Sequence, residues 1–284
     1  MEVIVTGIVL KTTEVGDFDK LITVLTEYGK VTFRAFGVRL MKSANASACM
    51  EFAYSEFSLD IKDGMCRLKK SQLIKTLIRP GKSLASLSLA FYIAEVCLFA
   101  STDFPLSKDE SRIHDDGLFT CAANALYLVS KSDREILLIK SVFELRLLSV
   151  LGFSPDIPYC SVCGEDCSEK GGYVSVHLVN GNLKCAKCNA DSFMRSSGME
   201  HLSSAGVSVT DAFEENTMMI SSDALMLVMR TLSVDDKKAY AVSVPGLLIK
   251  EFSSFTEKYL LNQLERGFKS LTYFKDIYSY ESNI

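Results

Sequence analysis

The sequence holds only three histidines among its 284 residues, and none of them stands in a catalytic motif. It has no H-E-x-x-H of zinc proteases, no H-x-E ahead of its P-Y-C-x-x-C that would indicate a zinc deaminase, and no G-x-S-x-G of serine hydrolases. The glycine-rich loops G-x-x-x-x-G-K-[ST] and G-x-G-x-x-G are also absent, so ATP hydrolysis and dinucleotide binding lack their phosphate cradles. We therefore expect a binding protein rather than an enzyme.

Signals for secretion and membrane insertion are lacking as well. The N-terminus, Met1 to Ile4, has no basic region followed by an apolar core and a small-residue cleavage site. The most apolar run, Leu84 to Ala100, is short for a membrane span and carries Ser86, Ser88 and Glu95, which favours a buried core helix. We expect a cytoplasmic protein without a membrane partner, in which four of the nine cysteines are ordinary buried thiols: Cys49, Cys66, Cys97 and Cys121.

The charge is unevenly distributed, although the net charge is only -4. Residues 1–82 carry 13 Lys and Arg against 9 Asp and Glu, whereas residues 83–284 carry 18 against 26. A basic front on an acidic body is expected when one domain of a chain touches a polyanion and the other does not. Chance scatter of charge over a solvated surface is the alternative.

The first 75 residues alternate apolar and polar positions with a period of two, as half-buried strands do. We interpret Gly7 as a bulge, and Tyr28–Lys30 and Asp63-Gly64 as turns between neighbouring strands. Five strands favour a small closed barrel, because closure removes exposed edges; an SH3-like barrel is one competitor that spacing alone does not separate. The predicted strands are Glu2–Glu14, Leu21–Thr26, Val31–Phe36, Phe52–Ile61 and Met65–Ile74.

Basic residues gather at the end of the third predicted strand and on the fifth. Cations beside aromatic rings are the mixture that single-strand-binding proteins use for phosphates and bases. We interpret the interleaved Phe33 and Phe36 as barrel core, and expect Arg34, Arg39 and Lys42 to contact phosphate. The basic residues on the fifth strand are Arg67, Lys69 and Lys70.

Around Arg79-Pro80-Gly81 the apolar period changes from two to about 3.6, which predicts a domain boundary followed by helices. A capping box of Ser132 and Glu135 precedes a central helix, Ile136–Val150, that stops at Gly152. The positions expected to face the core are Leu84, Leu87, Phe91, Ala94 and Leu98 in the first helix, and Phe119, Ala122, Ala123 and Leu126 in a second helix opened by Asp115-Asp116.

Two further helices are predicted near the C-terminus, over 222–232 and 245–266. The second begins with a proline in its first turn and ends at Gly267. One side of it carries a stripe that we interpret as core, with a groove for a partner's apolar tail as the alternative: Phe252, Phe255, Tyr259 and Leu260.

Two C-x-x-C pairs separated by twenty-one residues form the strongest motif: Cys160 with Cys163, and Cys185 with Cys188. Two such turns complete the tetrahedral sulfur shell that Zn²⁺ prefers, and four protein ligands leave no open position, so we expect structural zinc. The intervening segment is predicted to be a small ribbon whose folding the metal supports. A redox dithiol pair or a disulfide framework is the alternative, and a fifth thiol or an imidazole could substitute as ligand: Cys167 or His177.

Several short motifs follow one another along nearly the whole chain. They are Gly7-Ile8-Val9-Leu10-Lys11, Gly16-Asp17, Asp19-Lys20, Thr26-Glu27-Tyr28-Gly29-Lys30, Phe36-Gly37-Val38-Arg39, Phe143-Glu144-Leu145-Arg146-Leu147-Leu148, Leu151-Gly152-Phe153 and the two cysteine pairs. In this order they resemble the RecO family of bacterial DNA repair and recombination mediators.

The resemblance implies an α+β protein: an N-terminal five-stranded OB-fold barrel followed by an all-α domain with an inserted four-cysteine zinc ribbon. The expected limits are 1–80 for the DNA-binding barrel, 158–192 for the ribbon, and 81–157 with 193–284 for the helical domain. RecO-like proteins bind single- and double-stranded DNA, anneal complementary strands, contact RecR and the C-terminal tail of single-strand binding protein, and help load RecA. The resemblance thus implies a nucleoid-associated protein of the cytoplasm.

By position, Arg34 and Arg39 match the family's basic residues on the DNA-facing side of the barrel. Lys42 lies where the family is richer in Arg and Lys; here the loop reads Lys42-Ser43-Ala44-Asn45-Ala46-Ser47, which implies weaker DNA binding or more dependence on RecR. A zinc-ribbon adaptor with incidental DNA contact is the runner-up, and a zinc enzyme would need an open coordination site. The candidate DNA contacts are Lys11, Lys20, Arg34, Arg39, Lys42, Arg67, Lys69 and Lys70.

Overall fold

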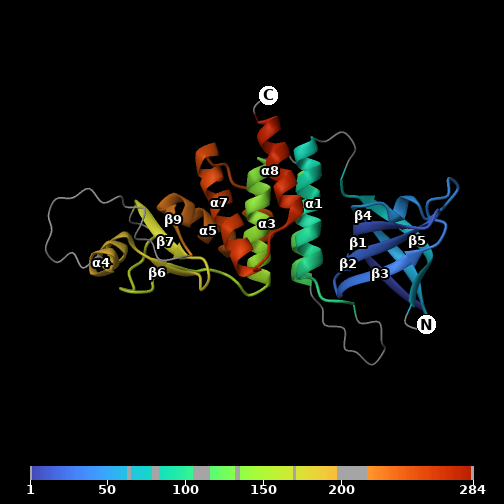
Figure 1. Ribbon diagram of the computed structural model, residues 1–284, viewed down its shortest axis with the longest axis horizontal. Helices are drawn as coiled ribbons and strands as arrows, with labels where there is room; N and C mark the ends of the chain where they lie inside the picture. The colour runs from blue at the N-terminus through green and yellow to red at the C-terminus, as the bar shows by residue number, and fades with distance from the viewer. Residues whose placement is uncertain are drawn as a thin grey trace. The chain divides into compact units, whose positions relative to one another are not determined.

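The computed structural model describes residues 2–62, 65–78, 83–104, 116–131, 135–168, 171–196 and 216–282. It divides into two compact units, Met1–Ile139 with Gly267–Ile284, and Lys140–Arg266 (Figure 1). No helix of the described residues is long and apolar enough to cross a membrane. Some expected features lie outside the described residues: the Asp63-Gly64 turn, the Arg79-Pro80-Gly81 boundary, Asp115 and Ser132.

The first unit begins with a closed barrel of strand order β1-β2-β3-β5-β4. β1 pairs antiparallel with both β2 and β4, and β3 closes the barrel by pairing in parallel with β5. This five-stranded closed barrel is the predicted OB-fold. The strands are β1 (Glu2–Val15), β2 (Asp19–Thr26), β3 (Gly29–Ala35), β4 (Ala53–Lys62) and β5 (Met65–Thr76), with a 3-10 turn, η1 (Ser47–Cys49), before β4.

One of the two phenylalanines assigned to the barrel core is there, and the other is not. Phe33 is 1% exposed and lies 5.1 Å from Phe57, ring centre to ring centre. Phe36 is 52% exposed, so its assignment to the core was wrong. β3 buries Val31, Phe33 and Ala35, so alternation turns the next side chain outward.

Gly7 is not the bulge that the sequence suggested. The register of β1 against β2 shifts between Val9 and Lys11 instead. A Cβ on Gly7 would lie 2.3 Å from the Leu25 carbonyl oxygen and 2.5 Å from Cγ1 of Val24. Glycine is therefore required here because β1 and β2 approach closely, not because the chain kinks.

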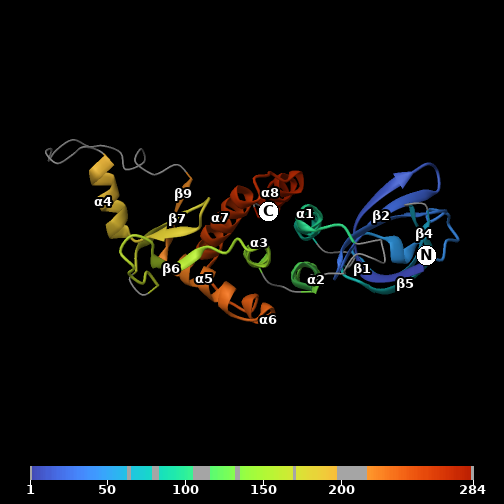
Figure 2. The same ribbon diagram turned by 90° about the horizontal axis from the view of Figure 1, so that it is seen from below.

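Three helices complete the first unit: α1 (Leu84–Ala100), α2 (Asp116–Lys131) and α8 (Lys269–Glu281). α8 was not predicted, and it lies antiparallel beside α1 (Figures 1 and 2). Oε1 of Glu281 accepts a hydrogen bond from the Leu84 backbone N–H at 3.0 Å, and Glu95 accepts one from the Ser270 N–H at 3.0 Å. A carboxylate thus caps the first turn of each helix.

The predicted inward face of α1 is largely exposed. Leu84, Leu87 and Phe91 are 65%, 38% and 39% exposed, whereas Ala94 is buried as expected. The helix is apolar on nearly every side, so its periodicity did not select a face. In the second helix Ala122 and Leu126 are buried, and Phe119 and Ala123 are half-buried. The side chains of α1 that pack inward are instead Ala85, Leu89, Tyr92, Ile93, Val96 and Cys97.

The second unit contains residues 140–150 of α3 (Ile136–Val150), together with α7 (Gly246–Gln263), α5 (Ser222–Ser233), which packs against α7, and the short α6 (Asp236–Ala239), which follows α5. The α7 stripe is core as predicted, since Phe252, Phe255, Tyr259 and Leu260 are all buried. Between α3 and α7 lies a buried ion pair: Lys140 Nζ is 2.8 Å from Glu144 and 3.0 Å from Glu257.

A four-stranded sheet of order β6-β8-β7-β9 forms the rest of the second unit. The ribbon strands β7 and β8 were expected, but β9 was not; it pairs with β7 from about forty residues further along the chain. A helix, α4, follows β8 directly. The bounds are β6 (Asp156–Cys160), β7 (Tyr173–His177), β8 (Asn182–Lys184), α4 (Ala186–Ser196) and β9 (Thr217–Ser221).

Gly7→Ala is expected to lower the free energy of unfolding by about 1–3 kcal/mol, because the new methyl group meets backbone that must move. Gly267→Ala is the matched control in the same unit, since a Cβ there has no heavy atom within 4 Å. Urea denaturation of the full chain followed by circular dichroism measures both. Equal midpoints for the two variants would contradict the close approach of β1 and β2.

Candidate functional site

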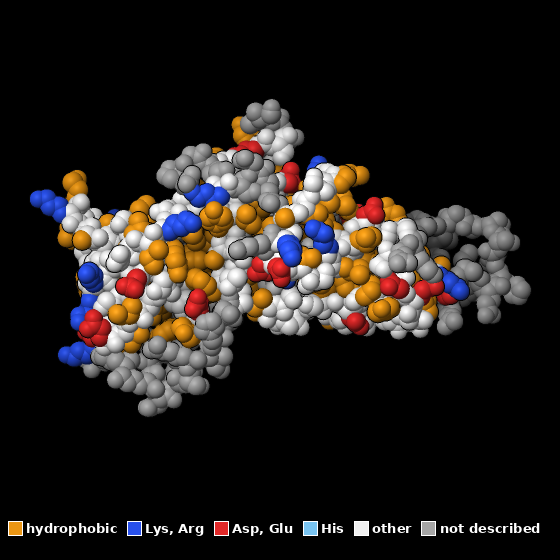
Figure 3. Space-filling view, turned by 180° about the vertical axis from the view of Figure 1, so that it is seen from behind, with side chains coloured by type: hydrophobic (Ala, Val, Ile, Leu, Met, Phe, Trp, Pro, Cys, Tyr) orange, Lys and Arg blue, Asp and Glu red, His pale blue; other side chains and the backbone are white. Residues whose placement is uncertain are grey.

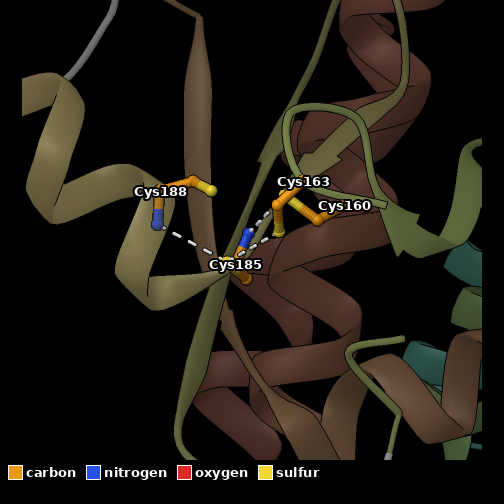
Figure 4. A group of neighbouring side chains, drawn as sticks. All are labelled: Cys160, Cys163, Cys185 and Cys188. Carbon is orange, nitrogen blue, oxygen red and sulfur yellow. Dashed lines mark hydrogen bonds between the residues drawn. The ribbon is translucent and has the colours of Figure 1, made fainter. Parts of the chain in front are cut away.

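Three elements of the second unit bring the four predicted metal cysteines together (Figure 4). Cys160 ends β6, and Cys163 lies in the turn that follows, which Gly164 closes with a positive φ of 73° and a 2.8 Å hydrogen bond to the Cys160 carbonyl. Cys185 follows β8, and Cys188 lies in the first turn of α4. Each C-x-x-C pair thus begins where a strand ends, and the β6–β8 pairing places the two pairs side by side.

The sulfur atoms have the spacing of a metal site and not of a disulfide. All four Sγ atoms lie within 4.8 Å of one another, and those of Cys163 and Cys185 are 3.8 Å apart. Zn–S bonds of about 2.3 Å in a tetrahedron require sulfur atoms about 3.8 Å apart, whereas a disulfide requires about 2.0 Å. None of the nine cysteines forms a disulfide bond, and the structure describes all of them. The cluster could hold a four-coordinate metal ion, and four sulfur ligands would fill its coordination shell.

Backbone N–H groups favour the thiolate form of Cys160, whereas the hydrogen bond with Cys163 and burial raise the pKa of Cys188. Burial alone would raise the pKa of Cys160, but hydrogen bonds from the N–H groups of Cys185, Cys163 and Val162 outweigh it and lower the pKa to about 6. The bond from Cys185 measures 3.4 Å, and the Cys188 N–H donates similarly to Cys185 Sγ at 3.4 Å. Since metals bind thiolates, these donors prepare the site for a cation.

The two substitute ligands named from sequence lie outside the cluster. Cys167 is buried, burial raises its pKa to about 11, and its thiol donates to the Glu165 carbonyl at 3.5 Å. Nδ1 of His177 accepts hydrogen bonds from the N–H groups of Val179 and Asn180 in the turn after β7. Both side chains therefore serve local turns.

Two loops of the barrel bring the best basic candidates to one place. The β1–β2 turn and the loop after β3 are joined by a 2.9 Å bond from the Arg39 N–H to the Phe18 carbonyl and a 2.8 Å bond from the Gly37 N–H to Asp19. Arg34 and Arg39 flank this junction, and Arg34 is the register partner of Arg67 where β3 meets β5.

Three candidate cations are already paired with carboxylates. Arg34 donates from Nε and one terminal nitrogen to Asp19 at 3.1 and 2.8 Å, Arg39 lies 3.1 Å from Glu14, and Lys69 lies 2.9 Å from Glu2. The Gly37 N–H and then Arg34 lower the pKa of Asp19, which keeps its carboxylate charged. Figure 3 shows Lys and Arg interspersed with Asp and Glu along the outer edge of the barrel.

The other five cations make no ion pair with any residue that the structure describes. Four of them are exposed, and Lys20, at the start of β2, is half-buried. Only Arg67 joins Arg34 at the junction of β3 and β5. The other three are spread over the barrel: Lys11 on β1, Lys42 in the loop after β3, and Lys70 on β5.

Two exposed aromatic residues beside these arginines were not among the expected contacts. Phe36 lies with its ring centre 4.7 Å from the Arg34 guanidinium and 5.8 Å from that of Arg67. Phe18, in the β1–β2 turn, is 54% exposed. Strand alternation would have identified Phe36, because it lies three residues after the buried Phe33 and therefore points to the opposite face, whereas nothing local marks Phe18.

Comparison with known proteins gives one consistent family. The family models "Recombination protein O N terminal" and "Recombination protein O C terminal" match residues 1–77 and 82–272. A DNA repair protein RecO of Symbiobacterium thermophilum is 26% identical over 267 residues, covering 94% of each chain. That of Acetivibrio thermocellus is 24% identical over 272 residues, covering 95% of each chain. Together with the OB-fold barrel and the cysteine cluster, these matches establish that the chain belongs to the RecO family of DNA repair proteins.

Proposed function

We propose that this protein is a recombination mediator that binds single- and double-stranded DNA and anneals complementary strands without catalysing a reaction. The carrying observation is the group of arginines at the junction of the β1–β2 turn and the loop after β3, on an OB-fold of this family. In OB-folds the face of strands 2 and 3 and the adjoining loops bind oligonucleotides. Neutralised phosphates let two strands approach, so annealing needs no cofactor turnover.

The carboxylates of Asp19 and Glu14, which pair with these arginines, are expected to weaken the affinity of the barrel for DNA. A phosphate that binds Arg34 competes with Asp19, because one oxygen of this carboxylate, Oδ2, already accepts charge-assisted hydrogen bonds from two nitrogens of the guanidinium. The same holds at Arg39 and Glu14. This exchange supports weak DNA binding that depends on a loading partner, and RecR is the partner proposed from the family.

The metal is proposed to be Zn²⁺, held by Cys160, Cys163, Cys185 and Cys188. A soft, all-thiolate set with tetrahedral spacing suits zinc, and four protein ligands make its role structural. The ion would neutralise thiolates that otherwise repel one another within 4.8 Å. The limits 1–80 and 158–192 stay a prediction for the DNA-binding barrel and the ribbon.

Further partners follow from family membership and from one apolar surface. Leu84, Leu87 and Phe91 of α1 and Tyr273 and Ile277 of α8 line a groove of about 280 Å³. We assign it to the C-terminal tail of single-strand binding protein, which would bring the mediator to covered gaps where RecA is loaded. Such work places the protein at the nucleoid in the cytoplasm. The groove also favours a second candidate function, a protein-interaction adaptor whose DNA contact is incidental.

The native protein is expected to carry about one equivalent of zinc. Cys185→Ser is expected to lose the zinc and, with it, the circular dichroism signal that the folded second unit contributes. Metal binding contributes on the order of 10 kcal/mol to folding such sites. Cys167→Ala is the matched control, because it removes a buried thiol outside the cluster. The zinc content of each protein is measured by mass spectrometry. A full equivalent of zinc in Cys185→Ser would contradict the assignment of Cys185 as a zinc ligand.

The double variant Arg34→Glu/Arg39→Glu is expected to weaken binding of a single-stranded oligonucleotide at least tenfold in low salt. It should also flatten the dependence of affinity on salt, since each phosphate contact contributes about 0.7 to the slope. Lys269→Glu/Lys275→Glu on α8 makes the same change of charge away from the barrel. If both double variants lose affinity equally in fluorescence anisotropy titrations, or neither does, the adaptor function is favoured.

Asp19→Asn is expected to strengthen single-strand binding about three- to tenfold, because it removes the carboxylate that competes for Arg34. The asparagine oxygen can still accept the hydrogen bond from the Gly37 N–H. Asp17→Asn removes the same charge from an exposed neighbour in the same turn. An equal gain in the two variants, measured by the same titration, would show that net charge rather than competition limits binding.

A further inference from the structure

The barrel displays two phenyl rings that its own core does not use. Phe18 and Phe36 are 54% and 52% exposed, whereas Phe33 and Phe57 fill the interior. They belong to two loops that hold each other by the Arg39-to-Phe18 and Gly37-to-Asp19 hydrogen bonds. Half-exposed phenyl rings contribute little to folding, so two of them on loops joined by hydrogen bonds point to a ligand with an apolar face.

The ring of Phe36 is held in position while it remains open to solvent. The Arg34 guanidinium lies 4.7 Å from the ring centre, and Arg34 is itself fixed by two hydrogen bonds to Asp19. Arg67 reaches the same ring from β5 at 5.8 Å. A ring fixed by its neighbours loses little conformational freedom when a flat ligand stacks on it.

We propose that Phe36 is a stacking platform for an unpaired nucleobase, with Phe18 as the second ring of the same single-strand site. The inference rests on the proposed DNA binding and specifies which form of DNA the barrel prefers. Every base presents a π-face, so stacking tolerates any sequence, and Arg67, which forms no ion pair with any described residue, is the cation beside the ring that can contact a neighbouring phosphate. The site lies in the loop that directly follows β3 and in the β1–β2 turn, in the region that OB-folds use for oligonucleotides.

Stacking on Phe36 makes the barrel bind separated strands more tightly than the annealed duplex. A base inside a duplex is stacked on both sides by its neighbours, so it cannot also stack on Phe36. The barrel therefore binds separated strands through both bases and phosphates, but binds the duplex through phosphates alone. Once two strands pair, the stacking contact is lost and the product is held more weakly than the substrates.

The test uses the full-length protein with Phe36→Ala, Phe36→Leu and Phe36→Tyr. Anisotropy titrations with oligo-dT, an abasic oligonucleotide of equal length and a duplex measure the three ligands. Phe36→Ala and Phe36→Leu are expected to bind oligo-dT about tenfold more weakly with an unchanged salt slope, and to bind the duplex and abasic strand within about twofold of the native protein. Phe36→Tyr keeps the ring and the affinity. Tyr280→Ala, which removes an exposed aromatic side chain from α8, leaves all three affinities unchanged.

Two results would overturn the platform. Native affinity of Phe36→Ala for oligo-dT would show that the ring contacts no base, as expected if the surface serves a protein partner instead. An equal loss on oligo-dT, abasic strand and duplex would show that Phe36 acts only by positioning Arg34. If the native protein bound none of the three ligands, the proposed DNA binding itself would be wrong. Failure of the stacking platform and failure of the proposed DNA binding therefore give different results.

Discussion

The carboxylate of Asp19 accepts two hydrogen bonds from the Arg34 guanidinium and one from the Gly37 N–H, and these three contacts organise the exposed face of the barrel. They tie the β1–β2 turn to the loop after β3. They also fix the guanidinium that lies over Phe36. Without this acid, Arg34 would lose the contacts that hold its guanidinium over Phe36, although the Arg39-to-Phe18 hydrogen bond would still join the two loops.

The second unit depends on a different balance of charge. Four sulfurs within 4.8 Å are unfavourable as thiolates unless a cation lies between them, yet backbone N–H groups already favour the thiolate at Cys160. The sheet around them is small, with strands of three to five residues. A metal ion would therefore contribute much of the free energy that a larger apolar core supplies elsewhere. In the same unit, the Lys140 side chain is buried between Glu144 of α3 and Glu257 of α7.

Much of the barrel could be predicted because strand alternation is a local property. All five strands were placed to within a few residues, and the cysteine spacing predicted the convergence of four sulfurs. Errors arose where the pattern was ambiguous or the partner distant. α1 is apolar all round, so its exposed Leu84 and Phe91 looked like core. β9 is too short to recognise without β7, and α8 is joined to α1 by hydrogen bonds of Glu281 and Glu95 whose partners lie 197 and 175 residues away in sequence.

By itself, the sequence determined the five strands of the barrel, how they alternate, and which thiols can share an ion. These follow from periodicity and from ligand chemistry, both of which act over short stretches of chain. Only the tertiary structure decided that Arg34, Arg39 and Lys69 are paired with acids, and that Phe36 stays open beneath two guanidiniums. Those outcomes depend on which residues meet across strands and loops. Whether a cation is paired with an acid is decided by the neighbour that folding brings to it, not by its own position in the sequence.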